Sequence, residues 1–132
     1  MMKKILMMLL LLVSTNVLAV DWVKVGGAVD GSVTTYVDPQ SIRKDGNKVR
    51  LWDLKDYNSG QVIGNKTFLS TIMRGEYDCF EYTKRSIDLY IYTGHMGGGN
   101  IVFSEQNQTD PAISAPPGSD FENVLKIVCP TK

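Results

Sequence analysis

The sequence predicts an α+β protein in which an antiparallel β-sheet of about six strands, arranged as a meander, carries a C-terminal α-helix on one face. Turn residues divide the chain into short apolar segments with two-residue alternation, which is typical of strands joined by local turns. The last segment instead repeats apolar residues at helical spacing. Two cysteines, Cys79 and Cys129, close a strand segment and this helix, so a disulfide bond between them would fasten the helix to the sheet.

The N-terminus has the three parts of a secretory signal peptide. Lys3 and Lys4 precede an unbroken apolar run over residues 5–13, and small or medium residues follow up to Ala19. This order predicts a signal peptide over residues 1–19, cleaved between Ala19 and Val20, and the run is too short for a membrane span. The alternative is an uncleaved anchor or an N-terminal core helix. Because no cysteine stands at the cleavage site, we expect an exported protein without a lipid anchor, located in the periplasm, at the cell surface or in the medium.

Residues 20–132 are expected to form a single domain. Cleavage would leave 113 of the 132 residues, with 12 basic and 14 acidic side chains. A domain of this size buries roughly two thirds of its unfolded surface, which is enough for one core. No run of basic residues is longer than two, so the sequence indicates no nucleic-acid partner. No second apolar run suggests a membrane span in the mature chain.

Three strands are predicted in the first half of the mature chain. Residues 21–25 (DWVKV) end at a pair of glycines, and residues 32–38 (SVTTYVD) end at Pro39. Asp45-Gly46 is a hairpin signal before the third strand, residues 48–57, which residues 58–60 (Asn-Ser-Gly) are expected to close. This strand is apolar on both faces, which predicts a central position in the sheet or a bulge.

Three further strands are predicted over residues 66–79, 82–92 and 100–105. The fifth alternates most clearly: Ile87, Leu89 and Ile91 share one face, and Tyr90 and Tyr92 share the other. An irregular connection over residues 107–119 then leads to the helix.

The predicted helix starts at a capping box formed by Ser119 and Glu122 and ends before Pro130. Four apolar residues form its stripe: Phe121, Val124, Leu125 and Val128. A helix this short needs tertiary packing. We expect its stripe to lie over Ile87, Leu89 and Ile91.

Cys79 and Cys129 both follow the export signal, and two thiols in an oxidising compartment usually pair. The alternative is two unpaired buried thiols. A bond would close a loop of about fifty residues, worth about 4 kcal/mol in the chain-entropy model.

The segment Tyr92–Glu105 (YTGHMGGGNIVFSE) contains the single histidine, His95, beside three glycines. Glycines that bind phosphate lead into a helix, whereas these lead into a strand. His95 has no cysteine or second histidine nearby to share a metal ion. The acidic residues near Cys79 are interpreted as a solvated strand end rather than a catalytic carboxylate pair. The sequence therefore predicts a structural loop, no catalytic residue, no cofactor and no metal site, and a protein that is not an enzyme.

Tyr90 and Tyr92 would face away from the helix. Exposed aromatic side chains on a sheet are favourable anchors for a partner protein, although cross-strand packing on a half-covered face is the simpler explanation. With His95 and Met96 from the glycine loop, they form the candidate binding face.

The order of these segments resembles the surface-adhesin protein E family of Gram-negative bacteria. The resemblance rests on Trp22 in DWVKV, YVDPQSI, VRLWDLKDY, the strand ending EYDC, the Met-Gly-x-Gly loop in YTGHMGGGNIV, and PPGSDFENVLKIVC. It implies a sheet with a C-terminal helix tied by the two cysteines. It also implies a non-enzymatic protein that binds a host matrix or serum protein or acts in the envelope. This chain differs from lipid-anchored members, since no cysteine follows the signal. The alternative function is inhibition of a lysozyme-type cell-wall hydrolase, for which the glycine loop would have to protrude.

Overall fold

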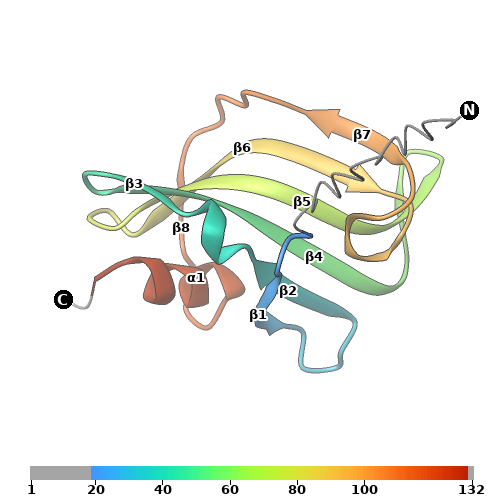
Figure 1. The fold of residues 1–132 in the computed structure, drawn as a ribbon, viewed down its shortest axis with the longest axis horizontal. Helices are drawn as coiled ribbons and strands as arrows, with labels where there is room; N and C mark the ends of the chain where they lie inside the picture. The colour runs from blue at the N-terminus through green and yellow to red at the C-terminus, as the bar shows by residue number, and fades with distance from the viewer. Residues whose placement is uncertain (1–18, 131–132) are drawn as a thin grey trace, which may run out of the picture.

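The computed structural model describes residues 19–130 and has one antiparallel sheet with one α-helix against it (Figure 1). The main strands are β1 (Val23–Gly27), β2 (Val33–Val37), β4 (Lys48–Ile63), β5 (Lys66–Asp78), β6 (Thr83–Tyr92) and β7 (Ile101–Glu105). They are hydrogen-bonded in this same order, so each of the six strands is antiparallel to the next one along this path. The predicted meander of six strands is confirmed.

Two short strands make the sheet larger than predicted. β3 (Arg43–Asp45) pairs with the start of β4, and β8 (Ile113–Ser114) pairs with the start of β6. β3 is the first arm of the hairpin that turns at Gly46, whose φ of 57° lies in the left-handed region that glycine adopts readily. The structure therefore has eight strands among its described residues rather than about six, because segments of two or three residues carry no alternation to detect.

The third predicted strand continues beyond its expected end. β4 runs to Ile63 and turns back into β5 at Gly64, whereas the sequence suggested closure at residues 58–60. The pairing with β5 is irregular between Asp56 and Gln61, so the Asn-Ser-Gly triplet forms a bulged stretch inside the strand. The prediction of a central strand or a bulge is correct on both counts, and the predicted strand end is wrong.

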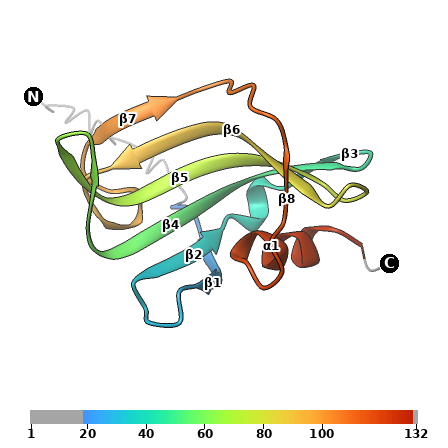
Figure 2. The ribbon, with the colours of Figure 1, turned by 180° about the vertical axis from the view of Figure 1, so that it is seen from behind.

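The helix α1 (Asp120–Val128) buries the stripe that the sequence indicates. Val124, Leu125 and Val128 are at most 3% exposed, and Phe121 is partly buried. They pack in one cluster with Val37 of β2, Val49 and Leu51 of β4, and Tyr77 of β5. Figures 1 and 2 show α1 beside β1 and β2, at the end of the sheet opposite to β7.

The expectation that the stripe covers Ile87, Leu89 and Ile91 is therefore wrong. The pairing of β5 with β6 shifts between Arg74 and Gly75, so Ile87 is the extra residue of a bulge. The bulge interrupts the alternation that made the three residues look like one face. Leu89 is only partly buried, and neither Ile87 nor Ile91 belongs to the cluster under the helix. The helix meets β6 instead at Lys84, whose Nζ lies 5.7 Å from the Phe121 ring centre.

The caps of α1 are close to the predicted ones. The Oγ of Ser119 accepts the N–H of Glu122 at 3.2 Å, as in a capping box. The Glu122 carboxylate, however, accepts the N–H of Gly118 at 3.4 Å rather than that of Ser119, and it pairs with Lys126 one turn later at 3.0 Å. Asp120 reaches outward to the sheet, where its carboxylate accepts the Gly27 N–H at 3.1 Å and the Thr35 hydroxyl at 2.5 Å.

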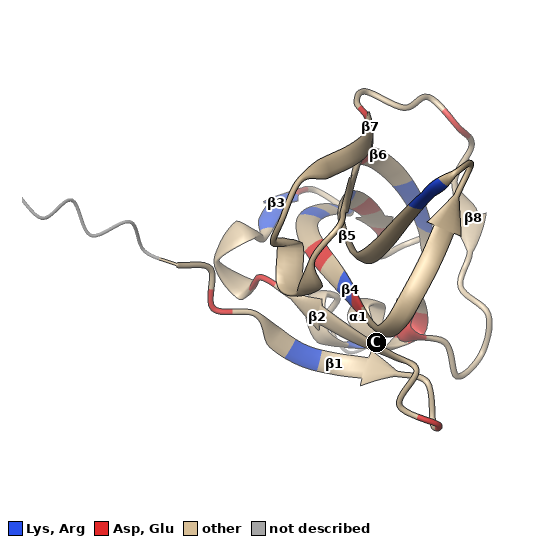
Figure 3. Cartoon of the chain, turned by 90° about the vertical axis from the view of Figure 1, so that its right-hand side faces the viewer, with Lys and Arg blue, Asp and Glu red and all other residues tan. Residues whose placement is uncertain are grey.

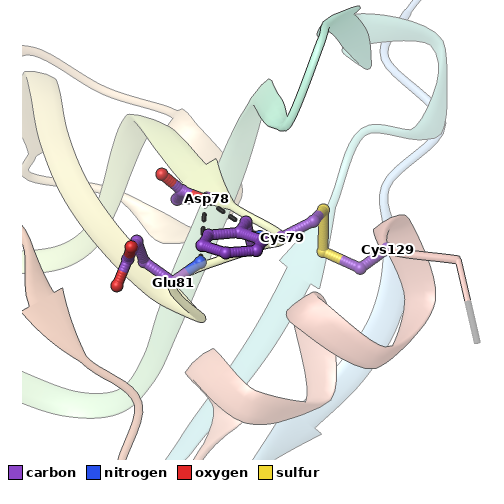
Figure 4. The surroundings of a disulfide bond; sticks show 5 residues. Asp78, Cys79, Glu81 and Cys129 are labelled. Atoms are coloured by element: carbon purple, nitrogen blue, oxygen red, sulfur yellow. Dashed lines mark hydrogen bonds between the residues drawn. A yellow bond between two sulfur atoms is a disulfide. The ribbon is translucent and has the colours of Figure 1, made fainter. Parts of the chain in front are cut away.

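Cys79 and Cys129 are joined in a disulfide, with their Cα atoms 5.4 Å apart (Figure 4). The bond ties the residue after β5 to the C-cap of α1, as the sequence predicted. Within residues 19–130, no helix is long and apolar enough to cross a membrane. The predicted signal peptide, residues 1–19, lies outside the described residues except for Ala19, and its cleavage between Ala19 and Val20 stays a prediction.

Candidate functional site

The sheet face opposite the helix carries a group of aromatic and charged side chains from β4, β5 and β6. Directly paired residues of antiparallel strands lie on the same face, so the register groups them into rows. Trp52, Arg74 and Asp88 form one such row. The Nε of Arg74 lies 2.7 Å from an Asp88 carboxylate oxygen, and its guanidinium lies 5.6 Å from the Trp52 ring centre. The indole also packs against Tyr90, with ring centres 6.1 Å apart.

The next row toward the β3 hairpin consists of Arg43, Arg50, Glu76 and Arg85. Glu76 accepts the Nε–H of Arg50 at 2.8 Å and lies 3.5 Å from Arg85. Lys48 is a third cation, at 3.8 Å. Partial burial alone would raise the pKa of Glu76, but the hydrogen bond from Arg50 and the charges of Arg50, Arg85 and Lys48 together hold it below its ordinary value. Glu76 is thus ionised and enclosed by cations.

A shallow hollow of about 590 Å³ opens on this face between the β3 hairpin and the centre of the sheet. It is lined by Asp38, Gln40, Ser41, Arg43, Arg50, Leu51, Trp52 and Arg74. The short 3-10 helix η1 (Pro39–Ser41) forms one wall of the hollow. The Asp38 carboxylate caps this turn by accepting the N–H of Gln40 at 3.0 Å. Ser41 joins this wall to β4, since its Oγ accepts the Trp52 N–H at 2.9 Å.

The glycine loop lies over the other end of the same face. Its 3-10 turn η2 (His95–Gly97) is bound to two neighbouring strands. Asp56 of β4 accepts the Met96 N–H at 2.8 Å and lies 3.2 Å from Nδ1 of His95. Ser70 of β5 donates its hydroxyl to the carbonyl of Gly94 at 2.6 Å and accepts the Gly97 N–H at 2.9 Å. The loop therefore folds back onto the sheet rather than projecting from it.

Gly97 is needed at its position for two reasons. Its φ of 75° is in the left-handed region, and a β-carbon there would lie 2.7 Å from Cδ1 of Ile72. Close packing against the sheet thus accounts for a glycine that the sequence alone presents as part of a flexible run.

The four predicted binding residues gather on one face of the sheet. Tyr90 of β6 pairs with Ile72 of β5, and Tyr92 pairs with Ser70. Ile72 and Ser70 both contact Gly97 of η2, so the two tyrosines lie beside this loop. His95 and Met96 belong to η2 itself, and Met96 is 41% exposed. Tyr90 packs on Trp52 and its hydroxyl accepts from Gln106 at 2.5 Å, so cross-strand packing holds for this residue. Sequence reasoning missed Trp52 and the arginines, although the alternation of Arg50, Trp52 and Leu54 along β4 was a usable signal.

The residue types of a hydrolase triad also meet under η2, since Asp56 pairs directly with Ser70 and contacts His95. Ser70 is fully buried, and both bonds of its hydroxyl are used to fasten the loop. A nucleophile must be accessible and hydrogen-bonded to its base, so this arrangement supports a structural role. Among the described residues no group of three histidine, cysteine or acidic side chains is placed to hold a metal ion.

The acidic residues near Cys79 do not form a carboxylate pair that faces a substrate. Asp78 accepts the N–H groups of Phe80 and Glu81 at 2.9 and 3.0 Å, which closes the turn between β5 and β6 (Figure 4). The N–H of Glu81 contributes most to lowering the pKa of Asp78. Burial opposes this, and the Phe80 N–H and Lys48 add to the lowering, so that the pKa stays below its ordinary value. Glu76 is enclosed by cations, as described above.

These features define a small disulfide-bonded sheet protein with its helix on one face and an open, charged and aromatic surface on the other. The sequence profile described as surface-adhesin protein E matches residues 22–130, and the chain belongs to this family. Among curated proteins no sequence relative was found.

Solved structures of Haemophilus influenzae protein E have a similar fold. One is 18% identical, with a TM-score of 0.62 over 82% of this chain and 83% of that chain. A second, from another crystal form, is 19% identical, with a TM-score of 0.60 over 72% and 79%. At this identity the likeness establishes the fold.

Proposed function

We propose that the protein is a non-enzymatic binding module with an adhesin-like role, and that it contacts a partner protein through its aromatic face. The aromatic face is defined here as Trp52, Tyr90, Tyr92, His95 and Met96. Membership of the surface-adhesin protein E family supports an adhesin-like role and a protein partner. The observation that carries the proposal is the gathering of these side chains on the sheet face that α1 leaves uncovered.

The composition of this face suits protein recognition. Tyrosine, tryptophan and arginine are the residues most enriched at the energetic centres of interfaces. Trp52 and Tyr90 are held by the sheet and by contact with each other, so they lose little conformational freedom when a partner binds. Membership of the family also supports an exported or surface location. We propose the periplasm, the cell surface or the medium as the address, and a host matrix or serum protein or an envelope protein as the partner.

We do not extend the proposal to inhibition of a lysozyme-type hydrolase. That function requires a loop that enters the enzyme's cleft, and the candidate loop is bound to Asp56 and Ser70 on the sheet. A lysozyme turnover assay with added protein is a direct test, and we expect no inhibition.

The binding role can be tested with immobilised matrix and serum proteins and with an envelope extract. Once a partner is captured, Tyr92→Ala and His95→Ala should each weaken its binding, by about tenfold or more if the residue is an interface anchor. The matched control is Phe80→Ala, which removes a 71% exposed aromatic side chain from the turn between β5 and β6. Thermal unfolding should confirm that all three variants fold. Equal weakening by the control, or none by the two face variants, would refute the aromatic face as the binding surface.

A further inference from the structure

All four arginines of the chain lie together on the face opposite the helix, although they are far apart in the sequence. Arg43 pairs directly with Arg50, Arg50 with Glu76, and Glu76 with Arg85. Arg74 is two residues from Glu76 along β5 and thus on the same face. Like charges directly opposite one another destabilise a sheet, so the Arg43–Arg50 pair does not help folding. Stability therefore does not explain why two arginines stand opposite each other, whereas binding of an anion would.

Arg43, Arg50 and Arg74 line two adjoining hollows, called the groove below. The hollow of about 590 Å³ beside η1 shares Arg43 and Arg50 with a second hollow of about 300 Å³ along the β3 hairpin, which Lys44, Asp45, Lys48 and Glu76 also line. The lining of the two hollows has five basic and three acidic residues, the latter being Asp38, Asp45 and Glu76. The chain from Val20 onward has more acidic than basic residues, and Figure 3 shows both kinds distributed over several elements of the ribbon. The lining of the two hollows has the opposite balance, so the groove is positive on an otherwise slightly negative protein.

Much of the hydrogen-bonding capacity of these arginines is unused within the described residues. Arg43 donates from Nη1 to the carbonyls of Gln40 and Ile42, both at 2.9 Å, and no carboxylate of residues 19–130 pairs with it. Arg50 uses Nε for Glu76, and its side chain is 48% exposed. Arg74 lies over Trp52, and its Nη groups make no hydrogen bond to any described residue. Guanidinium groups bind carboxylate and sulfate in a bidentate manner, which makes these groups available donors for an anion.

We propose that this groove binds a polyanionic glycan, that is, a sugar chain with repeated sulfate or carboxylate groups. Repeated anions can contact the cations along the groove together, whereas a single small anion would reach only one or two. The remaining lining also matches sugar: the side chains of Asp38 and Gln40 can exchange hydrogen bonds with hydroxyl groups, and Trp52 offers a ring to a sugar face. Peptide recognition is less well supported, because peptides are anchored by apolar side chains in pockets. Apart from Trp52, the groove has as its apolar lining only Leu51, which is 1% exposed.

This inference extends the proposed function, since the groove lies on the same side of the sheet as the aromatic face. Its test needs no protein partner, so the two proposals can fail separately. The probe is a heparin octasaccharide, with a glutamate peptide of equal charge and inorganic sulfate as comparisons, each titrated by calorimetry at low and at physiological salt. We expect the octasaccharide to bind most tightly and to lose affinity as salt rises, as expected when bound counterions are released.

The variant Arg43→Gln with Lys44→Gln should weaken octasaccharide binding by roughly tenfold, since it removes two exposed cations from the groove. Lys55→Gln with Lys126→Gln removes the same charge elsewhere and should change the affinity by less than about twofold. If the first variant unfolds, NMR shifts of wild-type amides on adding octasaccharide replace it, and they should concentrate in residues 38–52 and 74–76. Absence of octasaccharide binding at low salt, tighter binding of the glutamate peptide, equal weakening by the control variant, or shifts centred elsewhere would each overturn the proposal.

Discussion

Replacing Leu125 by alanine tests whether the core lies under the helix. Leu125 is fully buried at the centre of α1 and belongs to one cluster with Val37, Leu51 and Tyr77. Leu→Ala changes in cores cost about 2–5 kcal/mol, and the value rises with the cavity that remains. Here the cavity is bounded by hydrogen-bonded strands on one side and by a helix fastened by a disulfide on the other, so little collapse is possible. We therefore expect about 3–5 kcal/mol.

Such a loss is a large part of the 5–15 kcal/mol typical of a folded domain, and it should lower the Tm by roughly 10 °C or more. Urea unfolding followed by circular dichroism, with the disulfide intact, gives the free energy. The controls are Lys126→Ala, which removes a side chain that is 63% exposed, and Ile127→Ala, which removes an apolar side chain from a residue that is 57% exposed. Each should cost less than about 1 kcal/mol. Equal losses at 125 and 127 would show that the buried stripe is wrongly assigned.

Three further predictions concern the disulfide, the cation-enclosed carboxylate and the glycine loop. Thiol titration of the unfolded, unreduced protein should find neither Cys79 nor Cys129 free, and replacing both by serine should cost about 4 kcal/mol in the chain-entropy model. Because the folded protein lowers the pKa of Glu76, its interactions stabilise above the ordinary value of 4.5 and are lost as pH falls through the folded pKa. Glu76→Gln should therefore lower the urea midpoint at pH 7 and have little effect well below pH 4.5; a pH-independent difference would contradict this. Gly97→Ala should lower the Tm, since the added β-carbon would meet Ile72, whereas His95→Ala should change the Tm little. Equal Tm values for the two variants would refute the packing argument. Elemental analysis of the wild type should find no stoichiometric metal.

Much of the strand and helix structure could be predicted because it is coded by local patterns. Alternation along β6 and the helical spacing of Phe121, Val124, Leu125 and Val128 each identify an element from a few neighbouring residues. Which part of the sheet the apolar stripe of α1 packs against is determined by tertiary structure rather than by a local pattern. The bulge at Ile87 has no local sequence signature, and it removed the alternation on which the placement of the helix over β6 was based.

The candidate site was predictable only in part, for a related reason. Tyr90 and Tyr92 alternate within one strand, so their shared face could be inferred. Arg43, Arg50 and Arg74 become neighbours through the register of three strands, and in the sequence they form no basic run. The position of the glycine loop likewise depends on Asp56 and Ser70, which come from two other strands.

The pairing of each main strand with its neighbour along the meander has a consequence for how the protein folds. Hairpins close over short loops, whereas α1 must pack against residues of β1 and β2 and against Val49 and Leu51 of β4, which lie roughly seventy or more residues earlier in the chain. Contacts of high sequence separation form late, so we expect the sheet to assemble first and helix docking to limit the rate. Until then Val49, Leu51 and Tyr77 would face water on a sheet with open edges, which is the species most prone to aggregate. Formation of the Cys79–Cys129 bond would end that exposure, so slow oxidation should reduce the yield of refolded protein before it affects the stability of the native state.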